Sequence, residues 1–271
     1  MYSSREGFSC SFRPLRTRYT DVDIPAIAQW SQTLLLVVLR LTPPLAFAPP
    51  FTMIKVPSQV RVCLILSLSF ALSSGLPLEA QKFHGELYSA ATGELALGIS
   101  MALALQLTFA MIGVAGRMLD IQAGFGLAFL IDPSTKAQTP LFAAVFGYAA
   151  GIIFMWTGGL ADLLGVLEAS FRLIPPGHAS GPTDIAPLLR FMAAVTSLSF
   201  GVVALATIVL FLIDVSIALL SRTLPQMNVL VLGFQVKSLA TLLLLPITLG
   251  VGGAAIARML RLATDSMLAI G

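Results

Sequence analysis

Charge is scarce in this 271-residue chain. Lys, Arg, Asp and Glu together make up 11% of the residues, whereas 57% are apolar. Soluble domains carry roughly 25% charged residues, so a surface of this composition would not stay hydrated. The 16 Lys and Arg residues stand singly between apolar segments, a pattern typical of anchors at membrane interfaces rather than of nucleic-acid binding. The composition excludes an ordinary soluble domain and favours a membrane protein.

Cysteine and histidine are also scarce. The two cysteines, Cys10 and Cys63, do not make a disulfide framework. His84 and His178 have no Cys, Asp or Glu at the spacing of metal ligands. The sequence has neither a phosphate-binding glycine loop nor a Gly-x-Ser-x-Gly elbow. These absences predict a chain that is not an enzyme and that holds no metal or cofactor.

Long apolar runs are what the sequence has in abundance. About 20 apolar residues in a helix cross the roughly 30 Å hydrocarbon core of a bilayer, and the runs lack the alternation of barrel strands. The predicted fold class is therefore all-α, a multi-pass integral membrane protein of helical hairpins. Its six apolar segments are 30–54, 62–78, 95–116, 139–161, 191–213 and 238–257.

The first apolar segment is expected to be broken. Arg40 and the proline pairs Pro43-Pro44 and Pro49-Pro50 interrupt it, and each interior proline costs a helix roughly 3 kcal/mol. The uninterrupted piece is too short to span a bilayer. Broken backbone at membrane depth requires protein or a water-filled cavity beside it, so this region is expected to pack against other protein elements.

Two polar stretches divide the chain. Residues 1–24 form a polar N-terminal tail with no apolar stretch directly after its arginines, so no signal peptide is predicted. The proline- and glycine-rich stretch 174–187 is the best interruption between an N-terminal and a C-terminal half.

Asp214 is the acid most deeply embedded in an apolar run. A charge at mid-bilayer costs at least roughly 2.5–3.5 kcal/mol, so such a residue is a functional candidate by default. One interpretation is a proton pathway or a small secondary transporter that uses Asp214 and the broken first segment. The preferred interpretation places Asp214 near a helix end, paired with a neighbour such as Arg222 or with another subunit.

The stretch 113–140 combines glycines with polar residues and encloses a short apolar piece, 125–131, that ends at Asp132-Pro133. A residue before proline disfavours helix, and a run this short cannot cross a bilayer. It must lie in an interface, re-enter the membrane or sit inside an assembly. Glycines beside large apolar side chains suit a deformable constriction, although an ordinary hairpin turn explains the same residues equally well.

Several motifs follow one another in an order that resembles one known family. The sequence AGRMLDIQAGFG (115–126) matches the pattern AG-x-x-(I/L)-x-x-Q-x-G, and LPQMNVLVLGFQVK (224–237) matches a Pro-Gln-x-Asn segment followed by glycine and lysine. The other matching positions are Glu94 with Gly98, Asp132-Pro133, Pro140, Gly158-Gly159, Ser170-Phe171, Pro175 and Gly177. Each motif is weak alone, but their order over most of the chain resembles the FliR family of flagellar and type III secretion export-gate proteins.

The resemblance implies a structural gate subunit in the bacterial inner membrane, within the flagellar basal body. Its partners would be FliP-like and FliQ-like gate subunits, FlhB-like and FlhA-like export components, unfolded export substrates and membrane lipid, but no nucleic acid. The chain would combine a FliP-like helical part, 25–180, with a FliQ-like hairpin part, 181–271, and would contain broken helices. A virulence-type (injectisome) gate is the alternative within the same family.

The resemblance also implies roles for single residues. The loop near 124–133 would face the channel as a plug or gasket, with large apolar side chains as the seal and glycines as the flexible points. Its residues are Gly124, Phe125, Gly126, Phe129, Leu130, Asp132 and Pro133. Polar contacts between subunits are expected at Glu94, Arg117, Asp120, Gln122, Asp214 and Asn228.

Overall fold

The structure is a computed structural model that describes residues 24–49, 56–75, 86–125, 140–179, 184–223 and 229–270. These ranges are helical and contain no strand, which confirms the predicted all-α class. Their seven helices are α1 (Ile24–Ala46), α2 (Ser58–Gly75), α3 (Leu87–Gln122), α5 (Leu141–Trp156), α6 (Gly159–Leu173), α7 (Ala186–Thr223) and α8 (Val229–Ile270).

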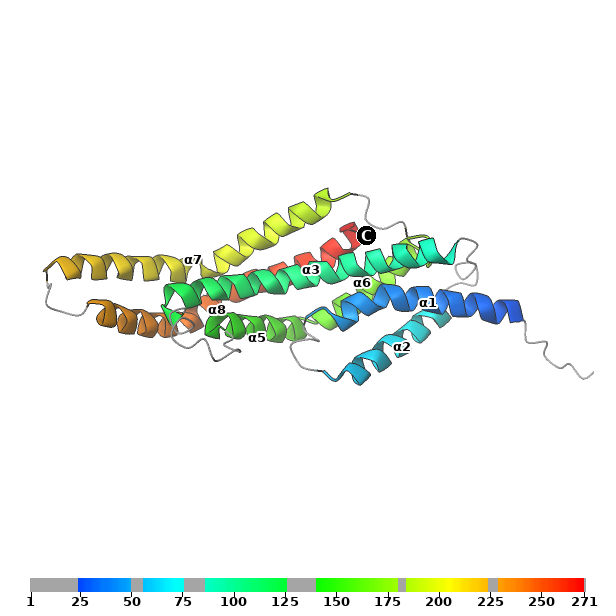
Figure 1. Ribbon diagram of the computed structural model, residues 1–271, viewed down its shortest axis with the longest axis horizontal. Helices are drawn as coiled ribbons and strands as arrows, with labels where there is room; N and C mark the ends of the chain where they lie inside the picture. Colours follow the sequence, from blue (N-terminus) through cyan, green and yellow to red (C-terminus); the bar gives the residue numbers. More distant parts are fainter. Residues whose placement is uncertain are drawn as a thin grey trace, which may run out of the picture.

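The helices form an elongated bundle with α3 at its centre (Figure 1). α7 and α8 lie side by side as an antiparallel hairpin that runs along the long axis, and α3 packs on both of them. α1 packs on α3 and on α2, while α5 joins α3 to α8. α3 contacts α1, which precedes it in the sequence, and α5, α7 and α8, which follow it. It is therefore the helix against which most of the others pack.

Four of the described helices, α2, α3, α7 and α8, are long and apolar enough to cross a membrane. Inside the molecule, 56% of the most apolar window of α3 is buried, but only 17–22% of the corresponding windows of α2, α7 and α8. Three of these helices therefore turn most of their apolar surface outward, toward lipid or other protein. The predicted multi-pass membrane architecture is confirmed.

The first apolar segment differs from the prediction. α1 begins at Ile24, continues through Arg40, passes Pro43 and Pro44 and ends at Ala46. The prolines lie in its last turn, so they end the helix instead of breaking its middle. Arg61 of α2 donates a hydrogen bond of 2.9 Å to the carbonyl oxygen of Ala46 and so caps this end.

The apolar run 139–161 is two helices rather than one segment. α5 ends at Trp156 and α6 begins at Gly159, with a bend of 69° between them. Gly158 makes the bend with φ of +80°, a conformation that only glycine adopts readily. The sequence run continued across the bend because the residues on both sides are apolar. α6 extends beyond the predicted run and exposes Asp162 and Glu168.

The interruption predicted at 174–187 is present as a gap between helices, because α6 ends at Leu173 and α7 begins at Ala186. The apolar runs 95–116, 191–213 and 238–257 lie within the longer helices α3, α7 and α8. The division into a FliP-like and a FliQ-like part stays a prediction.

Phenylalanines of α5 form a large part of the core, where Phe142, Phe146 and Phe154 are fully buried. Their helix approaches α3 closely at one glycine. A Cβ atom added to Gly116 would lie 2.5 Å from the Cα atom of Ala143, whereas one added to Gly113 would meet nothing within 4 Å. Gly116 therefore sets the distance between α3 and α5, as small residues do in membrane helix pairs.

Gly116→Ala is expected to destabilise the protein, because the backbone of α5 cannot yield as a flexible side chain can. The expected loss is about 1–3 kcal/mol, the usual effect of overpacking a close contact. Thermal unfolding of the detergent-purified protein measures it. Gly113→Ala is the matched control one turn earlier, and helix propensity predicts that it raises stability by about 0.5–1 kcal/mol. Equal unfolding midpoints for the two variants would contradict the packing argument.

Candidate functional site at the two ends of α3

A fully buried ion pair lies at the beginning of α3. Arg40 of α1 donates from Nε to Oε2 of Glu94 at 2.5 Å and from Nη2 to Oε1 at 2.9 Å. Both side chains are 0% exposed. The two parallel contacts form a fork-to-fork arrangement, the strongest geometry for an arginine with a carboxylate. The structure thus gives Glu94, which was predicted to form contacts between subunits, a partner inside its own chain.

The surroundings of the pair satisfy its remaining polar groups. Nη1 of Arg40 donates to the carbonyl oxygen and the hydroxyl of Ser170, both at 3.1 Å, and to the carbonyl oxygen of Ile174 at 2.9 Å. The guanidinium lies 4.3 Å from the ring centroid of Phe171, a cation–π distance. Glu94 Oε1 also accepts a hydrogen bond of 2.8 Å from the backbone N–H of Gly177.

These contacts join four segments of the chain. Arg40 belongs to α1, Glu94 to α3 and Ser170 to the last turn of α6, and Gly177 follows α6. The positive guanidinium at the C-terminal end of α6 also complements the dipole of that helix. Each nitrogen of the guanidinium and each oxygen of the carboxylate has a hydrogen-bond partner within the protein, so the arrangement orients the helices that carry them.

Close backbone approach surrounds the same pair. A Cβ atom on Gly98 would lie 2.5 Å from the carbonyl oxygen of Arg40, and one on Gly93 would lie 1.9 Å from that of Ala179. Only glycine at these two positions of α3 lets α1 and the segment after α6 come near enough for the buried hydrogen bonds to form.

Asp120 forms a second polar tie near the other end of α3. Its Oδ1 accepts a hydrogen bond from the backbone N–H of Phe142 at 3.0 Å, and its Oδ2 accepts one from that of Ala143 at 3.2 Å. Asp120 is buried, and these N–H groups are unpaired donors of the first turn of α5. Asp120 therefore caps α5 from a neighbouring helix. This contact lies within the chain, whereas Asp120 was predicted to form a polar contact between subunits.

The predicted channel loop is described only at its start. Gly124 has φ of +87°, and a Cβ atom there would lie 2.9 Å from the ring of Phe234 in α8. The Phe125 ring packs against those of Phe142 and Phe234, at centroid distances of 5.8 and 6.3 Å. These contacts fix the chain where it leaves α3. The other predicted loop residues, Gly126, Phe129, Leu130, Asp132 and Pro133, lie outside the described residues.

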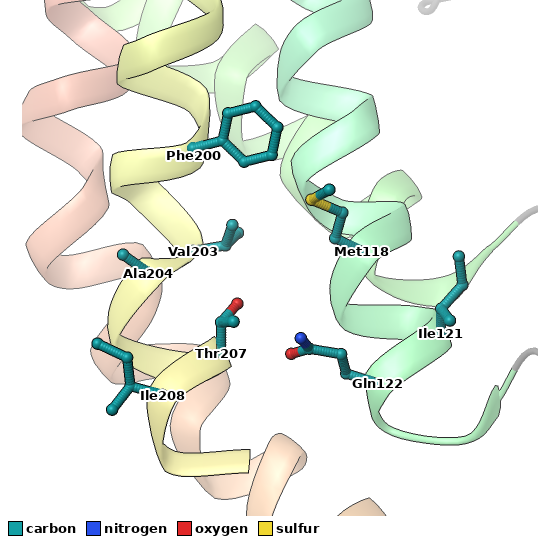
Figure 2. Close-up of a pocket in the computed structure, with 8 residues that line it drawn as sticks. All are labelled: Met118, Ile121, Gln122, Phe200, Val203, Ala204, Thr207 and Ile208. Carbon is teal, nitrogen blue, oxygen red and sulfur yellow. The ribbon is translucent and has the colours of Figure 1, made fainter. Parts of the chain in front are cut away.

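A groove with a volume of about 540 Å³ lies beside this end of α3. Figure 2 shows Met118, Ile121 and Gln122 of α3 on one side of it and residues of α7 on the other. The residues from α7 are Phe200, Val203, Ala204, Thr207 and Ile208. Gln122, a predicted contact residue, is thus part of a largely apolar groove that opens to the outside of the chain.

The remaining polar candidates are dispersed. Asp214 of α7 forms an ion pair with Lys237 of α8, not with Arg222; the carboxylate is 46% exposed and the ammonium group 23%. Arg117 is exposed on α3, and Asn228 lies outside the described residues. Of the predicted contact residues, Arg117, Asp120 and Gln122 lie near one end of α3, Glu94 near the other, and Asp214 on the hairpin.

Sequence reasoning missed the two basic partners, Arg40 and Lys237. Arg40 was interpreted as an interruption of the first apolar run, although an arginine inside such a run usually indicates a buried acidic partner. That signal could have linked it to Glu94, the acid beside a glycine in another apolar segment.

The comparisons with known proteins all point to bacterial export and secretion proteins. The family described as "Bacterial export proteins, family 1" matches residues 31–263. The flagellar biosynthetic protein FliR of Escherichia coli is 26% identical over 79% of this chain and 79% of its own length. The surface presentation of antigens protein SpaR of Shigella flexneri is 26% identical over 77% of this chain and 82% of its own. The secretion system apparatus protein SsaT of Salmonella typhimurium is 27% identical over 70% and 75%.

The outward-facing apolar helices and the buried polar ties define an all-α integral membrane protein of the export class. The family match extends over α2 to α7 and includes most of α1 and α8, so both ends of α3 lie within it. The chain belongs to the FliR family of bacterial export proteins. The resemblance inferred from the motifs is confirmed.

Breaking the buried ion pair is expected to unfold or severely destabilise the protein. Arg40→Met leaves the Glu94 carboxylate without its cation, and Glu94→Leu leaves the guanidinium without its anion. Each single change should cost about 3–5 kcal/mol. The double variant removes both charges and should be markedly more stable than either single variant. Chemical unfolding of all four proteins gives the coupling energy, and additive losses would show that the two side chains act independently.

Removing the cap of α5 is expected to cost more than removing an exposed cap. Asp120→Ala leaves two N–H donors of α5 without partners, one buried and one partly buried, and an unpaired buried donor costs about 1–3 kcal/mol. Asp184 offers a matched control, because its exposed Oδ1 accepts a hydrogen bond of 2.9 Å from the backbone N–H of Ala186 at the start of α7. Asp184→Ala should cost only about 1 kcal/mol. Unfolding midpoints decide, and a larger loss for Asp184→Ala would refute the assignment of Asp120.

Proposed function

We propose that this chain is a structural, non-enzymatic subunit of the flagellar type III protein export gate in the bacterial inner membrane, at the flagellar basal body. Membership of the FliR family, with matched residues from 31 to 263, is the observation that carries the proposal. The FliR names of relatives support the flagellar system. The SpaR and SsaT names support a virulence-type gate as the second candidate.

The outward apolar surface supports a role inside an assembly. Large side chains such as Phe211, Leu243 and Val251 are more than half exposed on α7 and α8. A soluble monomer does not leave so much apolar surface uncovered, and neighbouring subunits together with lipid can cover it. FliP-like and FliQ-like gate subunits are the proposed neighbours, with FlhB-like and FlhA-like components nearby. Lipid covers whatever apolar surface these partners leave free.

The proposed channel function rests on the loop that leaves α3 at Gly124. Residues 124–133 face the path of unfolded export substrates and close it at rest. An apolar constriction closes a pore by dewetting and needs no charge. The support in the described residues is the anchoring of the loop at its start: Asp120 ties the end of α3 to the start of α5, and Phe125 packs between Phe142 and Phe234.

Deletion of the gene in the source bacterium tests the proposal. Loss of flagellar substrates from the culture medium, together with loss of swimming, is the expected result, and the cloned gene should restore both. Intact swimming with loss of secreted virulence proteins would select the virulence-type gate. Normal secretion by every such system would overturn the assignment to an export gate.

Opening the apolar seal is expected to make membranes permeable to ions. Phe129→Ser combined with Leu130→Ser replaces two large apolar side chains with small polar ones that water can wet. Conductance of cells or planar bilayers that contain the assembled gate measures the effect. Leu173→Ser, which alters an exposed apolar residue at the end of α6, serves as the control. If the double variant conducts no more than the wild type, these residues are not the seal.

A further inference from the structure

The groove between α3 and α7 contains a polar group in an unusual state. Oε1 of Gln122 is shielded from solvent and has no hydrogen-bond partner, a condition that only the hydroxyl of Ser69 shares among the described residues. An unpaired buried acceptor costs about 1–3 kcal/mol, and native structures contain few of them. Gln122 Oε1 therefore has no hydrogen-bond donor among the described residues, and a donor from outside the chain would remove this cost.

Apart from Thr207, the other side chains that line the groove are apolar, and its rim is accessible. Ile121 is 71% exposed at its rim on α3, and Ile208 is 58% exposed at its rim on α7. Figure 2 shows the Gln122 amide and the Thr207 hydroxyl pointing toward one another across the opening. The amide therefore already lies at the groove, and a small movement of the long Gln122 side chain is enough to expose its oxygen to an incoming group.

We propose that this groove receives a helix of a neighbouring subunit that carries a hydrogen-bond donor, a hydroxyl or amide side chain, level with Gln122. The proposal rests on the proposed function, since it requires an assembly. The apolar rim packs against the flank of the incoming helix. The donor pairs with Gln122 Oε1 and removes the cost of the unpaired carbonyl, so binding gains both apolar burial and a hydrogen bond.

The chemistry of the amide favours protein over lipid as the occupant. An acyl chain can fill an apolar groove, but it has no N–H or O–H group to donate. Hydroxyl and amide side chains at membrane helix interfaces supply that donor and are common there. Thr207 marks a second polar position at the same level of the groove, which suits a partner side chain that both donates and accepts.

Copurification with FliP-like and FliQ-like subunits from the same genome tests the inference. Gln122→Met keeps the length of the side chain and removes the amide. It should reduce the yield of complex at limiting expression about 2- to 10-fold, the equivalent of one hydrogen bond. Because it also removes an unpaired buried acceptor, the unfolding midpoint of the isolated variant should not fall. Gln106→Met, which alters an exposed glutamine elsewhere on α3, is the matched control.

A bulky residue at the rim provides a second test. Ile208→Trp should block the groove and reduce the yield of complex about 10-fold or more, whereas Ser216→Trp, at an exposed polar position two turns further along α7, should not. Wild-type yields for both Gln122→Met and Ile208→Trp would overturn the inference and show that lipid or the chain itself fills the groove. Failure of the wild-type chain to copurify would count against the proposed function instead.

Discussion

The architecture depends on one buried ion pair. Arg40 and Glu94 are fully buried and bonded to each other through two hydrogen bonds, and the free energy of leaving either charge alone in an apolar interior is too high for the fold to survive. The pair can form only if α1, α3 and the end of α6 take one relative position. It therefore selects a single arrangement among the many that apolar helices could adopt. This specificity, more than net stability, is the use of such a pair in a protein so poor in charge.

α3 carries two such polar ties, one near each end. The rise of an α-helix places Glu94 and Asp120 about 39 Å apart along it. The Glu94 tie fixes the N-terminal helices and α6, and the Asp120 tie fixes the start of α5 beside the place where the chain leaves α3. The helix between them is largely apolar, and its close contacts rest on small residues such as Gly98 and Gly116. A long helix held near both ends is a suitable frame for the loop to which a channel role is proposed above.

The sequence was sufficient to predict the class of fold but only part of its geometry. Long apolar runs identified α2, α3, α7 and α8, because a bilayer-length helix leaves a local record in composition. The bend at Gly158 was missed, because apolar residues on both sides of it conceal the change of direction. The partners of Glu94 and Asp214 were missed for a different reason. Arg40 lies 54 positions from Glu94 in the sequence, so a charge within an apolar run indicates that a buried partner exists but does not identify that partner.

The role of Asp120 also depends on a contact between distant segments. Its polar character within an apolar stretch marked it as a residue of interest, but only the packing of α5 against α3 reveals that it caps a neighbouring helix. Hydropathy identified the long helices but not which of them are buried, since the apolar windows of α2, α7 and α8 are only 17–22% buried. The first apolar run was expected to be a broken span, yet α1 is a continuous helix whose arginine is buried against α3. In such a chain, interruptions of an apolar run indicate contacts with protein.

The central claim is that the chain works as one subunit within a larger membrane gate. Native mass spectrometry of the complex purified through a tag on this chain, after coexpression with the proposed FliP-like and FliQ-like partners, tests it most directly. The account predicts a stable complex that contains a single copy of this chain and several copies of the other subunits. A stable, well-folded chain that is extracted from the membrane by itself, with no copurified subunit, would contradict it.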